Sequence, residues 1–282
     1  MSAQTIGAAL RAATDQIRAG GVDVPRLTAE VLLAHALGLG RAQLLARLEQ
    51  PLAGPDAASY WALVARAAAA TPLAYLTGRR EFFGLEFDVD ESVLVPRPET
   101  ELLVEVALEG LATGPAHVID VGTGSGIIGV TLAAKRQAIH VTAIDRSASA
   151  LAIARRNAVR HGVDERMRFL EQDLLDPSPL PADLICANLP YIPSADVAKL
   201  AVSRHEPKLA LDGGPDGLDL IRRLIAQAGT VLTPAGRLVL EIEARQGPAV
   251  SALCHDAFPR AAVRVLRDFA DLDRVVVLDR GV

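Results

Sequence analysis

The sequence predicts an α/β protein built from two parts of different size. Residues 1–75 carry apolar side chains at three- and four-residue steps, which predicts amphipathic helices packed into a small all-α bundle. Over residues 99–282, short apolar runs alternate with helical stripes, which predicts a mostly parallel sheet covered by helices on both faces. Residues 76–98 lose the helical period, so we expect a linker that contains a β-hairpin.

Composition excludes several classes of protein. The chain has 282 residues, of which 50% are hydrophobic and 22% charged, so it can bury a substantial core. Its net charge of −5 gives no general attraction to nucleic acid or to an anionic membrane. No stretch approaches the ~20 apolar residues of a membrane span, and the N-terminus lacks the apolar core of a signal peptide. We therefore expect a cytoplasmic protein without direct nucleic-acid or membrane partners.

The two cysteines, Cys186 and Cys254, are too few for a disulfide scaffold or a thiolate metal site. Cys186 lies in an apolar run, so we expect a buried free thiol, which fits a reducing compartment. The six histidines are scattered and lack the spacing typical of metal ligands. The sequence therefore predicts no metal centre.

Four helices with short links are expected in the N-terminal part. Glycine pairs, prolines and hydroxyl residues mark their ends, and we expect Thr28 to cap the second helix. In order, the helices are expected from near Ile6 to Gly20-Gly21, from Thr28 to near Gly38, over Leu44–Leu48, and from Pro55-Asp56 through Ala67. Nothing in this bundle resembles catalytic machinery, which favours a packing or docking role.

The linker and the C-terminal part follow a different pattern. Apolar side chains tend to alternate over residues 82–95, with Gly84 and Asp90 near breaks, and Pro96-Arg97-Pro98 then resists regular structure. After a helical stripe over residues 102–111, strands are expected at residues 117–121, 139–144, 167–170, 183–187, 237–242, 263–266 and 275–278. Helices are expected at residues 126–136, 147–162, 217–232 and 248–257.

A glycine-rich motif connects the first strand of the C-terminal part to the helix that follows. It comprises Gly122, Thr123, Gly124, Ser125 and Gly126. Glycines there let the backbone turn sharply and approach a ligand, and the helix N-terminus lies just beyond. The spacing departs from the dinucleotide fingerprint and suits a nucleoside and amino-acid ligand better than a pyrophosphate. A tight turn without a ligand is the alternative.

Two acidic positions follow the next two strands. Asp145 ends the second strand, where a carboxylate can accept hydrogen bonds from both ribose hydroxyls, although an acid at a helix start is the simpler alternative. Asp173 and Leu174 follow the third strand, where they can contact an adenine edge and ring; Asp173 can instead cap a turn. Because such strand ends line one crevice, we expect these residues near the glycine motif.

The most specific motif is Asn188-Leu189-Pro190-Tyr191, directly after the strand at residues 183–187. In this position it resembles the Asn-Pro-Pro-Tyr amino-methyltransferases that use S-adenosylmethionine. Their acceptor nitrogen is planar and conjugated, so its lone pair is a poor nucleophile. The asparagine oxygen and a neighbouring backbone carbonyl can accept its two N–H bonds and orient it toward the methyl donor. The resemblance implies that Pro190 restrains the backbone and that Tyr191 forms an aromatic wall.

Further segments resemble the protein-(glutamine-N5) methyltransferases. They are Pro72–Gly78, Glu81–Leu85, Val93–Glu101, Glu206-Pro207, Ala210–Gly214, Asp216–Leu218 and Asp271–Val276. The run Arg97–Glu101 favours the release-factor branch over the ribosomal-protein branch.

The resemblance implies a Rossmann-like methyltransferase domain preceded by a helical substrate-docking domain. It implies transfer from S-adenosylmethionine, with S-adenosylhomocysteine as product, to the glutamine of the Gly-Gly-Gln loop in class 1 peptide chain release factors. Gly122–Gly126, Asp145, Asp173, Leu174 and Asn188 would hold the cofactor, and Asn188–Tyr191 would hold the glutamine. With no heptad or extra apolar stripe, a monomer is expected.

The chain departs from the family pattern at three places. Leu189 replaces the usual first proline of the motif, so we predict a less restrained carbonyl there and reduced preorganisation. Glu243-Ala244 and Ala270-Asp271 stand where the pattern is usually richer in glycine, away from the motif.

Three other functions stay open at the level of sequence. A DNA adenine-N6 methyltransferase faces the same chemical problem, but it needs phosphate contacts and a target-reading region that this acidic chain does not show. A Rossmann-fold reductase is disfavoured by the glycine spacing. The third function is that of a non-catalytic protein that docks on release factors or ribosomes, in which Leu189 makes the site inactive.

Overall fold

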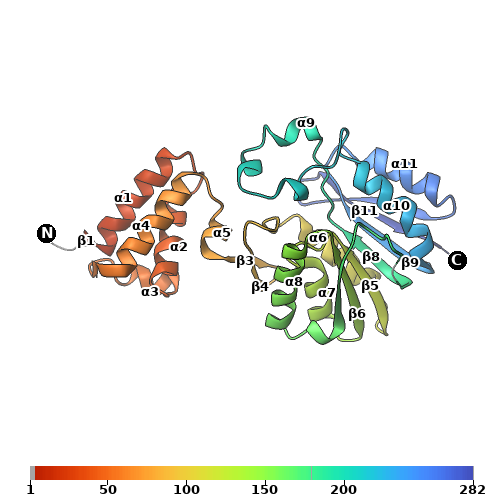
Figure 1. The fold of residues 1–282 in the computed structure, drawn as a ribbon, viewed down its shortest axis with the longest axis horizontal. Coiled ribbons are helices and arrows are strands. Elements are labelled where there is room, and N and C mark those ends of the chain that lie inside the picture. The colour runs from red at the N-terminus through yellow and green to blue at the C-terminus, as the bar shows by residue number, and fades with distance from the viewer. Residues whose placement is uncertain (1–3, 179, 282) are drawn as a thin grey trace. The chain divides into compact units, whose positions relative to one another are not determined.

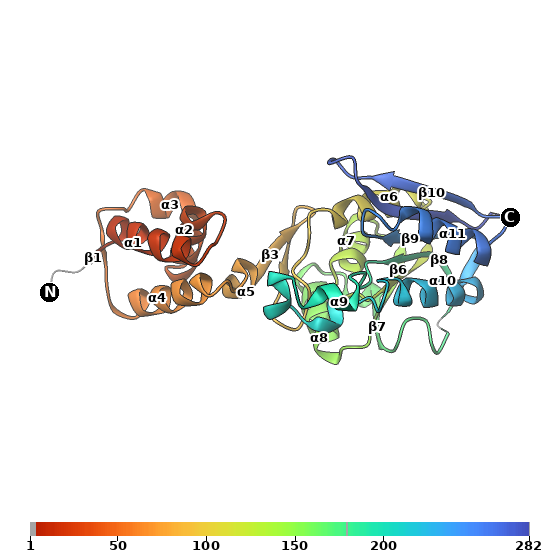
Figure 2. The ribbon, with the colours of Figure 1, turned by 90° about the horizontal axis from the view of Figure 1, so that it is seen from above.

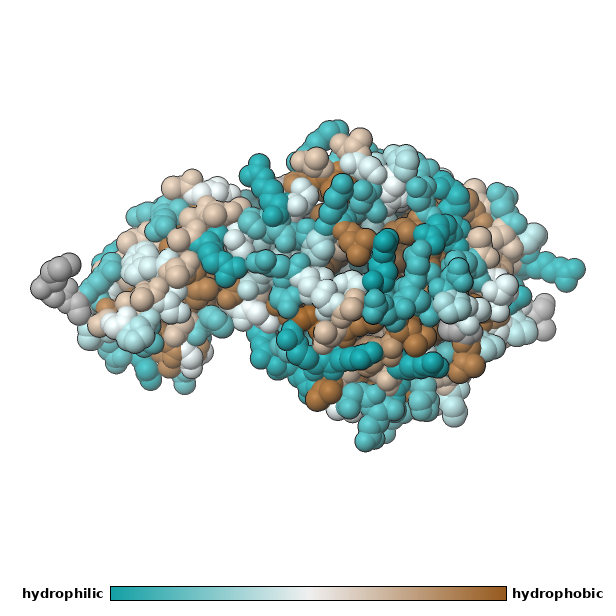
Figure 3. Space-filling view, in the orientation of Figure 1, coloured by the Kyte–Doolittle hydropathy of each residue, from teal (hydrophilic) through white to brown (hydrophobic). Residues whose placement is uncertain are grey.

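The computed structural model describes residues 4–178 and 180–281, which fall into two compact units. One unit extends to Arg79 and the other begins at Arg80, inside the segment predicted as the linker. The face drawn in Figure 3 is mostly hydrophilic, with separate apolar patches between the charged side chains. Among the described residues, no helix is long and apolar enough to cross a membrane.

The N-terminal unit is helical, as predicted (Figure 1). Its elements are β1 (Gln4–Thr5), α1 (Ile6–Ala19), α2 (Pro25–Ala36), α3 (Arg41–Leu45), β2 (Pro51–Leu52), α4 (Gly54–Ala68) and α5 (Leu73–Thr77). The core of the unit contains Leu10, Ile17, Leu32, Leu33, Leu44 and Tyr60. The short strands β1 and β2 pair antiparallel, and neither they nor α5 were predicted.

The predicted cap at Thr28 is wrong. Helix α2 begins three residues earlier, at Pro25, and its N-cap Val24 makes no side-chain cap hydrogen bond. Proline at the first helical position has a φ angle suited to a helix, so it starts α2 without a hydroxyl cap. Thr28 lies inside the helix, where its Oγ1 donates back to the Val24 carbonyl at 3.0 Å.

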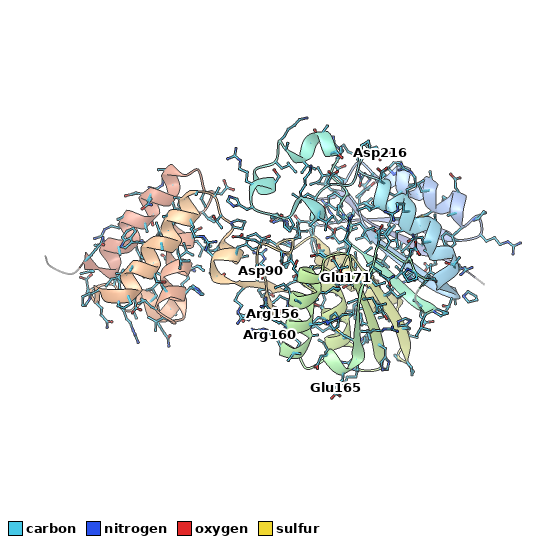
Figure 4. All side chains as sticks on the ribbon, viewed as in Figure 1. Asp90, Arg156, Arg160, Glu165, Glu171 and Asp216 are labelled. Carbon is cyan, nitrogen blue, oxygen red and sulfur yellow. The ribbon has the colours of Figure 1, made fainter. Side chains whose placement is uncertain are left out.

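A β-hairpin opens the C-terminal unit. Strands β3 (Arg79–Phe82) and β4 (Leu85–Asp88) form a two-stranded sheet, and Phe83 and Gly84 make the turn with φ angles of +53° and +73°. Two arginines of one neighbouring helix contact this region. Arg160 pairs with Asp88 of β4 at 3.1 Å. Arg156 pairs with Asp90, just after β4, at 3.6 Å, and Figure 4 labels both residues of this second pair.

The C-terminal unit is built on a seven-stranded sheet, several of whose strands are labelled in Figure 2. The strand order is β10-β11-β9-β8-β5-β6-β7. The strands are β5 (Ala116–Val121), β6 (Ile139–Asp145), β7 (Met167–Glu171), β8 (Ala182–Ala187), β9 (Leu232–Glu241), β10 (Ala262–Arg267) and β11 (Asp273–Asp279). From β9 through β7 all neighbours are parallel, whereas β11 and β10 join as an antiparallel pair. The predicted α/β class and mostly parallel sheet are confirmed.

Helices cover both faces of this sheet, as predicted. They are α6 (Thr100–Gly110), α7 (Ile127–Lys135), α8 (Ala148–Arg160), α10 (Asp219–Val231) and α11 (Gly247–Ala257). Helices α6, α7 and α8 share one hydrophobic cluster with the sheet, and α10 and α11 share the other. Ser147 caps α8 as expected, since its hydroxyl accepts from the Ala150 N–H at 3.2 Å. Cys186 is a fully buried free thiol, whose pKa burial raises.

The strand order reverses at β5, which has β6 on one side and β8 on the other. In open parallel sheets, a ligand crevice forms outside the carboxyl ends of the strands at such a point. The loops after β5, β6 and β8 all leave from this edge. Between β8 and α10 the chain makes only short elements: α9 (Ser194–Val197), η2 (Ala201–Arg204) and η3 (Lys208–Ala210). One further turn, η1 (Asp164–Arg166), precedes β7.

Strand β9 is longer than expected. The sequence predicted residues 237–242, but the strand extends back to Leu232 through Pro234 and Gly236. Pairing with β8 shifts register in this stretch, and such an irregularity accommodates a proline and a glycine that sequence patterns place outside strands.

Candidate active site

A cavity of about 810 Å³ opens at the carboxyl ends of β5, β6 and β8. The cavity lining includes most of the residues that the sequence singled out, namely Gly122, Thr123, Gly124, Ser125, Asp145, Asp173, Leu174, Asn188, Leu189 and Pro190. Gly126 and Tyr191 lie outside the lining. In the part of the chain that the structure describes, no group of three or more His, Cys, Asp and Glu side chains is arranged to hold a metal ion.

The glycine motif forms a tight loop whose conformation requires glycine. Gly122, Gly124 and Gly126 have φ angles of +71°, +56° and +83°, in the left-handed region that other residues rarely adopt. Backbone N–H groups of Gly122 and Thr123 both donate to the Ile144 carbonyl, at 2.8 and 2.9 Å. A Cβ atom on Gly122 would lie 3.1 Å from Leu189 Cδ2. The loop therefore presents bare backbone to the cavity, a cradle that suits a bound ligand.

The buried carboxylate of Asp120 anchors this loop by hydrogen bonds, a role that was not predicted from the sequence. Its buried Oδ2 accepts from Thr123 Oγ1 at 2.5 Å and from the Gly129 N–H at 2.9 Å. Burial raises the pKa of Asp120 to about 6, although both hydrogen bonds favour the charged form. The sequence does contain a signal for this role, because Asp120 is an acidic residue in an apolar stretch of β5.

Asp145 ties the end of β6 to the same loop. Its Oδ2 accepts from the Gly124 N–H at 3.0 Å, and its Oδ1 accepts from the Ser147 N–H at 2.9 Å. Burial raises the pKa of Asp145, and the backbone hydrogen bonds oppose that shift. A carboxylate oxygen has more than one acceptor site, so both oxygens can still accept from a ligand hydroxyl in the cavity.

Asp173 and Leu174 border the cavity from the segment after β7. Asp173 is about half exposed, and its Oδ2 pairs with Arg223 Nη2 of α10 at 2.6 Å. The Asp173 side chain therefore holds α10 beside the cavity. Leu174 is buried, with a φ angle of +55°.

Asn188 follows directly after β8 and lines the cavity half-buried. Its Nδ2 donates to Thr100 Oγ1, the first residue of α6, at 3.1 Å. Among the described residues, Asn188 Oδ1 has no hydrogen-bond partner, so the amide is held by its nitrogen and keeps its oxygen for a ligand. The sequence placed Thr100 within the family-like run Arg97–Glu101, but nothing in it paired Thr100 with Asn188, which lies 88 positions away.

The rest of the motif divides between the cavity and the core. Leu189 is 4% exposed and packs into the hydrophobic cluster under α10, while Pro190 borders the cavity. Tyr191, expected as an aromatic wall, is instead partly buried against the same cluster and does not line the cavity. Burial raises the pKa of Tyr191 to about 12. Gln246 Nε2 donates to the Tyr191 carbonyl at 3.1 Å.

Two segments that resembled the family meet at the cavity. Arg97 Nη2, before α6, contacts both carboxylate oxygens of Glu206 at 2.7 and 2.6 Å. The Glu206 side chain is 1% exposed, and burial raises its pKa while Arg97 opposes the shift. Because Arg97 and Pro207 both line the cavity, this pair fixes the segment after β8 against the segment before α6.

Asn157 joins the hairpin to the glycine loop. This fully buried side chain of α8 donates to the carbonyls of Ser125 and Asp88 at 2.8 and 3.0 Å, and it accepts from the Asp88 N–H at 2.7 Å. Both amide protons and the amide oxygen are engaged between these two segments, so Asn157 couples the position of the hairpin to that of the loop.

Comparisons with known proteins agree with this architecture. Two protein-family models match the chain, the PrmC N-terminal domain over residues 8–78 and the methyltransferase small domain over residues 98–205. The release factor glutamine methyltransferase of Moorella thermoacetica is 45% identical over 273 residues, 96% of each chain. That of Burkholderia pseudomallei is 45% identical, over 93% of this chain and 94% of its own.

Solved structures support the fold of the C-terminal unit. A ribosomal protein L11 methylase from Lactobacillus delbrueckii has a TM-score of 0.52 at 21% identity, over 69% of this chain and 84% of its own. A Thermus thermophilus 16S rRNA methyltransferase, solved with AdoMet and guanosine, has a TM-score of 0.52 at 17% identity, over 72% of this chain and 49% of its own.

The chain belongs to the release factor glutamine methyltransferase family, because relatives more than 40% identical match nearly its whole length. The predicted family, the Rossmann-like methyltransferase fold and the S-adenosylmethionine-dependent methyltransferase class are thereby confirmed.

Proposed function

We propose that this chain transfers the methyl group of S-adenosylmethionine to the side-chain amide nitrogen (N5) of a glutamine. The substrate is the glutamine of the Gly-Gly-Gln loop in class 1 peptide chain release factors. One observation carries the proposal: Asn188 lies in the same cavity as the glycine loop, held by Thr100 so that its oxygen is left for an acceptor. The names of the relatives support the choice of substrate.

The glycine loop and Asp145 are the residues that would hold the cofactor. The loop Gly122–Gly126 offers backbone without side chains, and Asp145 offers carboxylate oxygens at the adjacent strand end. Leu174 adds an apolar wall, and Asp173 lines the cavity beside it. When bound, S-adenosylmethionine supplies an electrophilic methyl group on a sulfonium sulfur.

Asn188 and Leu189 orient the acceptor, which is the side-chain amide nitrogen of the glutamine. An amide nitrogen shares its lone pair with its carbonyl, so it attacks poorly unless its N–H groups are engaged and oriented. Asn188 Oδ1 accepts one N–H, and the backbone carbonyl of Leu189 accepts the other. As the N–C bond forms and the S–C bond breaks, positive charge grows on the nitrogen, and both acceptor oxygens stabilise it. The extra proton leaves to solvent after transfer, so no general base is required.

The remaining parts of the proposal concern partners. The N-terminal helical unit, which matches the PrmC N-terminal domain over residues 8–78, docks the release factor. The protein acts as a monomer in the cytoplasm, where release factors work, and makes no direct contact with nucleic acid. The net charge of −5 supports the last point.

The test is incubation of the purified chain with S-adenosylmethionine and a purified release factor, followed by peptide mass mapping. We expect one added methyl group on the loop glutamine, and none when that glutamine is replaced by asparagine. DNA is offered in parallel, because methylation of adenine instead would replace this proposal. Cofactor binding by calorimetry without any transfer would overturn it in favour of a docking protein.

A further inference from the structure

A short segment between β8 and α10 lies directly on the backbone of the Asn188–Tyr191 motif. We call this segment, residues 211–217, the strap. The Gly213 N–H donates to the Ile192 carbonyl, just after the motif, at 2.8 Å. A Cβ atom on Gly213 would lie 2.6 Å from the Pro190 carbonyl oxygen, closer than real Cβ atoms approach. The strap therefore touches the motif so closely that glycine is required at this point.

Gln246 joins the strap to the motif with a side chain whose three hydrogen bonds all go to backbone groups. Its Nε2 donates to the Tyr191 carbonyl at 3.1 Å and to the Gly217 carbonyl at 3.3 Å. Its Oε1 accepts from the Glu243 N–H at 3.1 Å. A backbone N–H only donates and a carbonyl only accepts, so these partners fix which way the Gln246 amide points. The side chain is buried and does not line the cavity.

The peptide group between Tyr191 and Ile192 is held at both of its polar atoms. Its carbonyl oxygen accepts from Gln246, while its N–H donates to the Leu211 carbonyl of the strap at 3.1 Å. Both residues of this peptide are half-buried, so a polar atom that turned away would lose a partner that water does not fully replace. The far end of the motif therefore has one orientation.

Leu189 lies between two fixed ends of the motif. On one side, Asn188 is held by Thr100 at 3.1 Å; on the other, Tyr191 is held by Gln246. A leucine leaves φ free where a proline would fix it at about −65°, so the direction of the Leu189 carbonyl depends on how firmly these ends are held. In the proposed function, this carbonyl accepts an N–H of the substrate amide.

We infer that Gln246 is a positioning residue for methyl transfer. By holding the Tyr191 carbonyl against the strap, it keeps the Leu189 carbonyl directed at the acceptor nitrogen. This inference rests on the proposed function, in which Asn188 Oδ1 and the Leu189 carbonyl together orient that nitrogen. Transfer requires the nitrogen to lie in line with the methyl donor, so a small error in this direction slows the step and leaves docking of the release factor unchanged.

The test compares Gln246→Met with the wild-type chain on the release factor. Methionine keeps the length of the side chain and removes all three hydrogen bonds. We expect kcat to fall about tenfold, because each lost hydrogen bond costs a factor of about two to ten. KM for the release factor, and the cofactor Kd by calorimetry, should change less than about twofold, since Gln246 does not line the cavity.

Arg245→Met is the matched control. Arg245 is the preceding residue in the same loop, and its side chain is 88% exposed and pairs with Glu243. The same replacement there should leave kcat, KM and the cofactor Kd unchanged. An equal loss of kcat in both variants would indicate a general effect on the loop between β9 and α11, and the inference would be wrong.

Gln246→Glu separates the hydrogen bonds to the motif from the contact at the start of α11. A glutamate keeps an oxygen for the Glu243 N–H, but it sets a second oxygen against the carbonyls of Tyr191 and Gly217. We therefore expect kcat to fall at least as far as in Gln246→Met. If this variant kept the wild-type kcat, the contact with Glu243 alone would account for Gln246 and the inference would fail.

Leu189→Pro supplies a measurement that a purely structural role would not move. A proline restrains the same backbone from within the chain, so the restraint from Gln246 then matters less. Leu189→Pro should therefore raise kcat more in the Gln246→Met background than in the wild-type chain, with the two gains differing by about threefold or more. Equal gains in both backgrounds would show that the two residues act independently, against the inference.

Circular dichroism shows whether each variant folds. If one of the two replacements of Gln246 fails to fold, the other decides alone, again with Leu189→Pro as its second change. A wild-type kcat in Gln246→Met would overturn the inference while leaving the proposed function intact. An inactive wild-type chain would instead overturn the proposed function.

Discussion

The two sides of the cavity are held in different ways. The glycine loop is fixed by groups close in sequence: Thr123 bonds to Asp120 three positions away, and Gly124 bonds to Asp145, 21 positions away. The acceptor side is fixed by distant groups, since Asn188 is held by Thr100 across 88 positions and Arg97 meets Glu206 across 109. The cofactor side is thus a local structure of β5 and β6, whereas the acceptor side exists only after the whole unit has folded.

This difference implies that the two sides fail separately. Damage to the acceptor side should remove transfer and leave cofactor binding largely intact. Damage to the glycine loop should weaken cofactor binding first. Variants on the two sides should therefore separate the loss of transfer from the loss of cofactor binding.

Asn188→Ala should give the largest loss. It removes the oxygen that accepts the substrate N–H and the nitrogen held by Thr100. We expect kcat on the release factor to fall by about 10²–10³-fold, the range found when one preorganised polar group is removed at a developing charge. Cofactor affinity, measured by calorimetry, should fall much less. A loss of cofactor binding as large as the loss of rate would show that the two sides are not separable.

Asp145→Ala should affect the opposite side. The change removes the carboxylate that accepts from the Gly124 and Ser147 N–H groups and faces the cavity. We expect the cofactor Kd to rise by about tenfold to thirtyfold, with a smaller change in kcat at saturating cofactor.

Glu171→Ala is the matched control for Asp145→Ala. Glu171 is the exposed neighbour of Asp145 on β7 and does not line the cavity (Figure 4). Its replacement should leave cofactor affinity unchanged. An equal loss in both variants would indicate a general effect of charge at this edge of the sheet.

The same contrast explains how much was predictable from sequence. The glycine loop, Asp145, the order of helices and strands along the chain, and the position of Asn188 follow from local patterns that a single sequence displays. The contact between Thr100 and Asn188 carries no such pattern, because it arises only when the start of α6 packs beside the end of β8. Tyr191 shows the limit of a motif: its place in the chain was clear, but its side chain packs against the hydrophobic cluster and does not line the cavity.

Asp120→Asn should change how stability depends on pH. The folded pKa of about 6 lies above the usual 3.8, so the contribution of Asp120 to stability is fully present below about pH 4 and is lost as the pH rises through 6. Asparagine does not titrate. The melting temperature of the wild-type chain should therefore fall relative to the variant, by a few degrees, between pH 4 and pH 7.

A constant difference between the two melting temperatures across this range would contradict the raised pKa. The comparison of variant with wild type matters because other carboxylates titrate in the same window and cancel in the difference. Cofactor affinity should also fall in Asp120→Asn, since Asp120 supports the loop through Thr123 and Gly129.

Leu189→Pro should have the smallest effect. It should raise kcat and lower the melting temperature. Proline would restrict the backbone whose carbonyl accepts the substrate N–H, so kcat should rise about two- to fivefold, in line with the roughly 0.4–1 kcal/mol of a compatible proline. Leu189 is also buried in the cluster that contains Val121 and Ile144, and its loss should lower the melting temperature. Faster transfer by a less stable protein would show that the acceptor side limits turnover through backbone freedom. An unchanged or lower kcat would mean that the contacts of Thr100 with Asn188 and of Gln246 with Tyr191 already hold this side as firmly as a proline could.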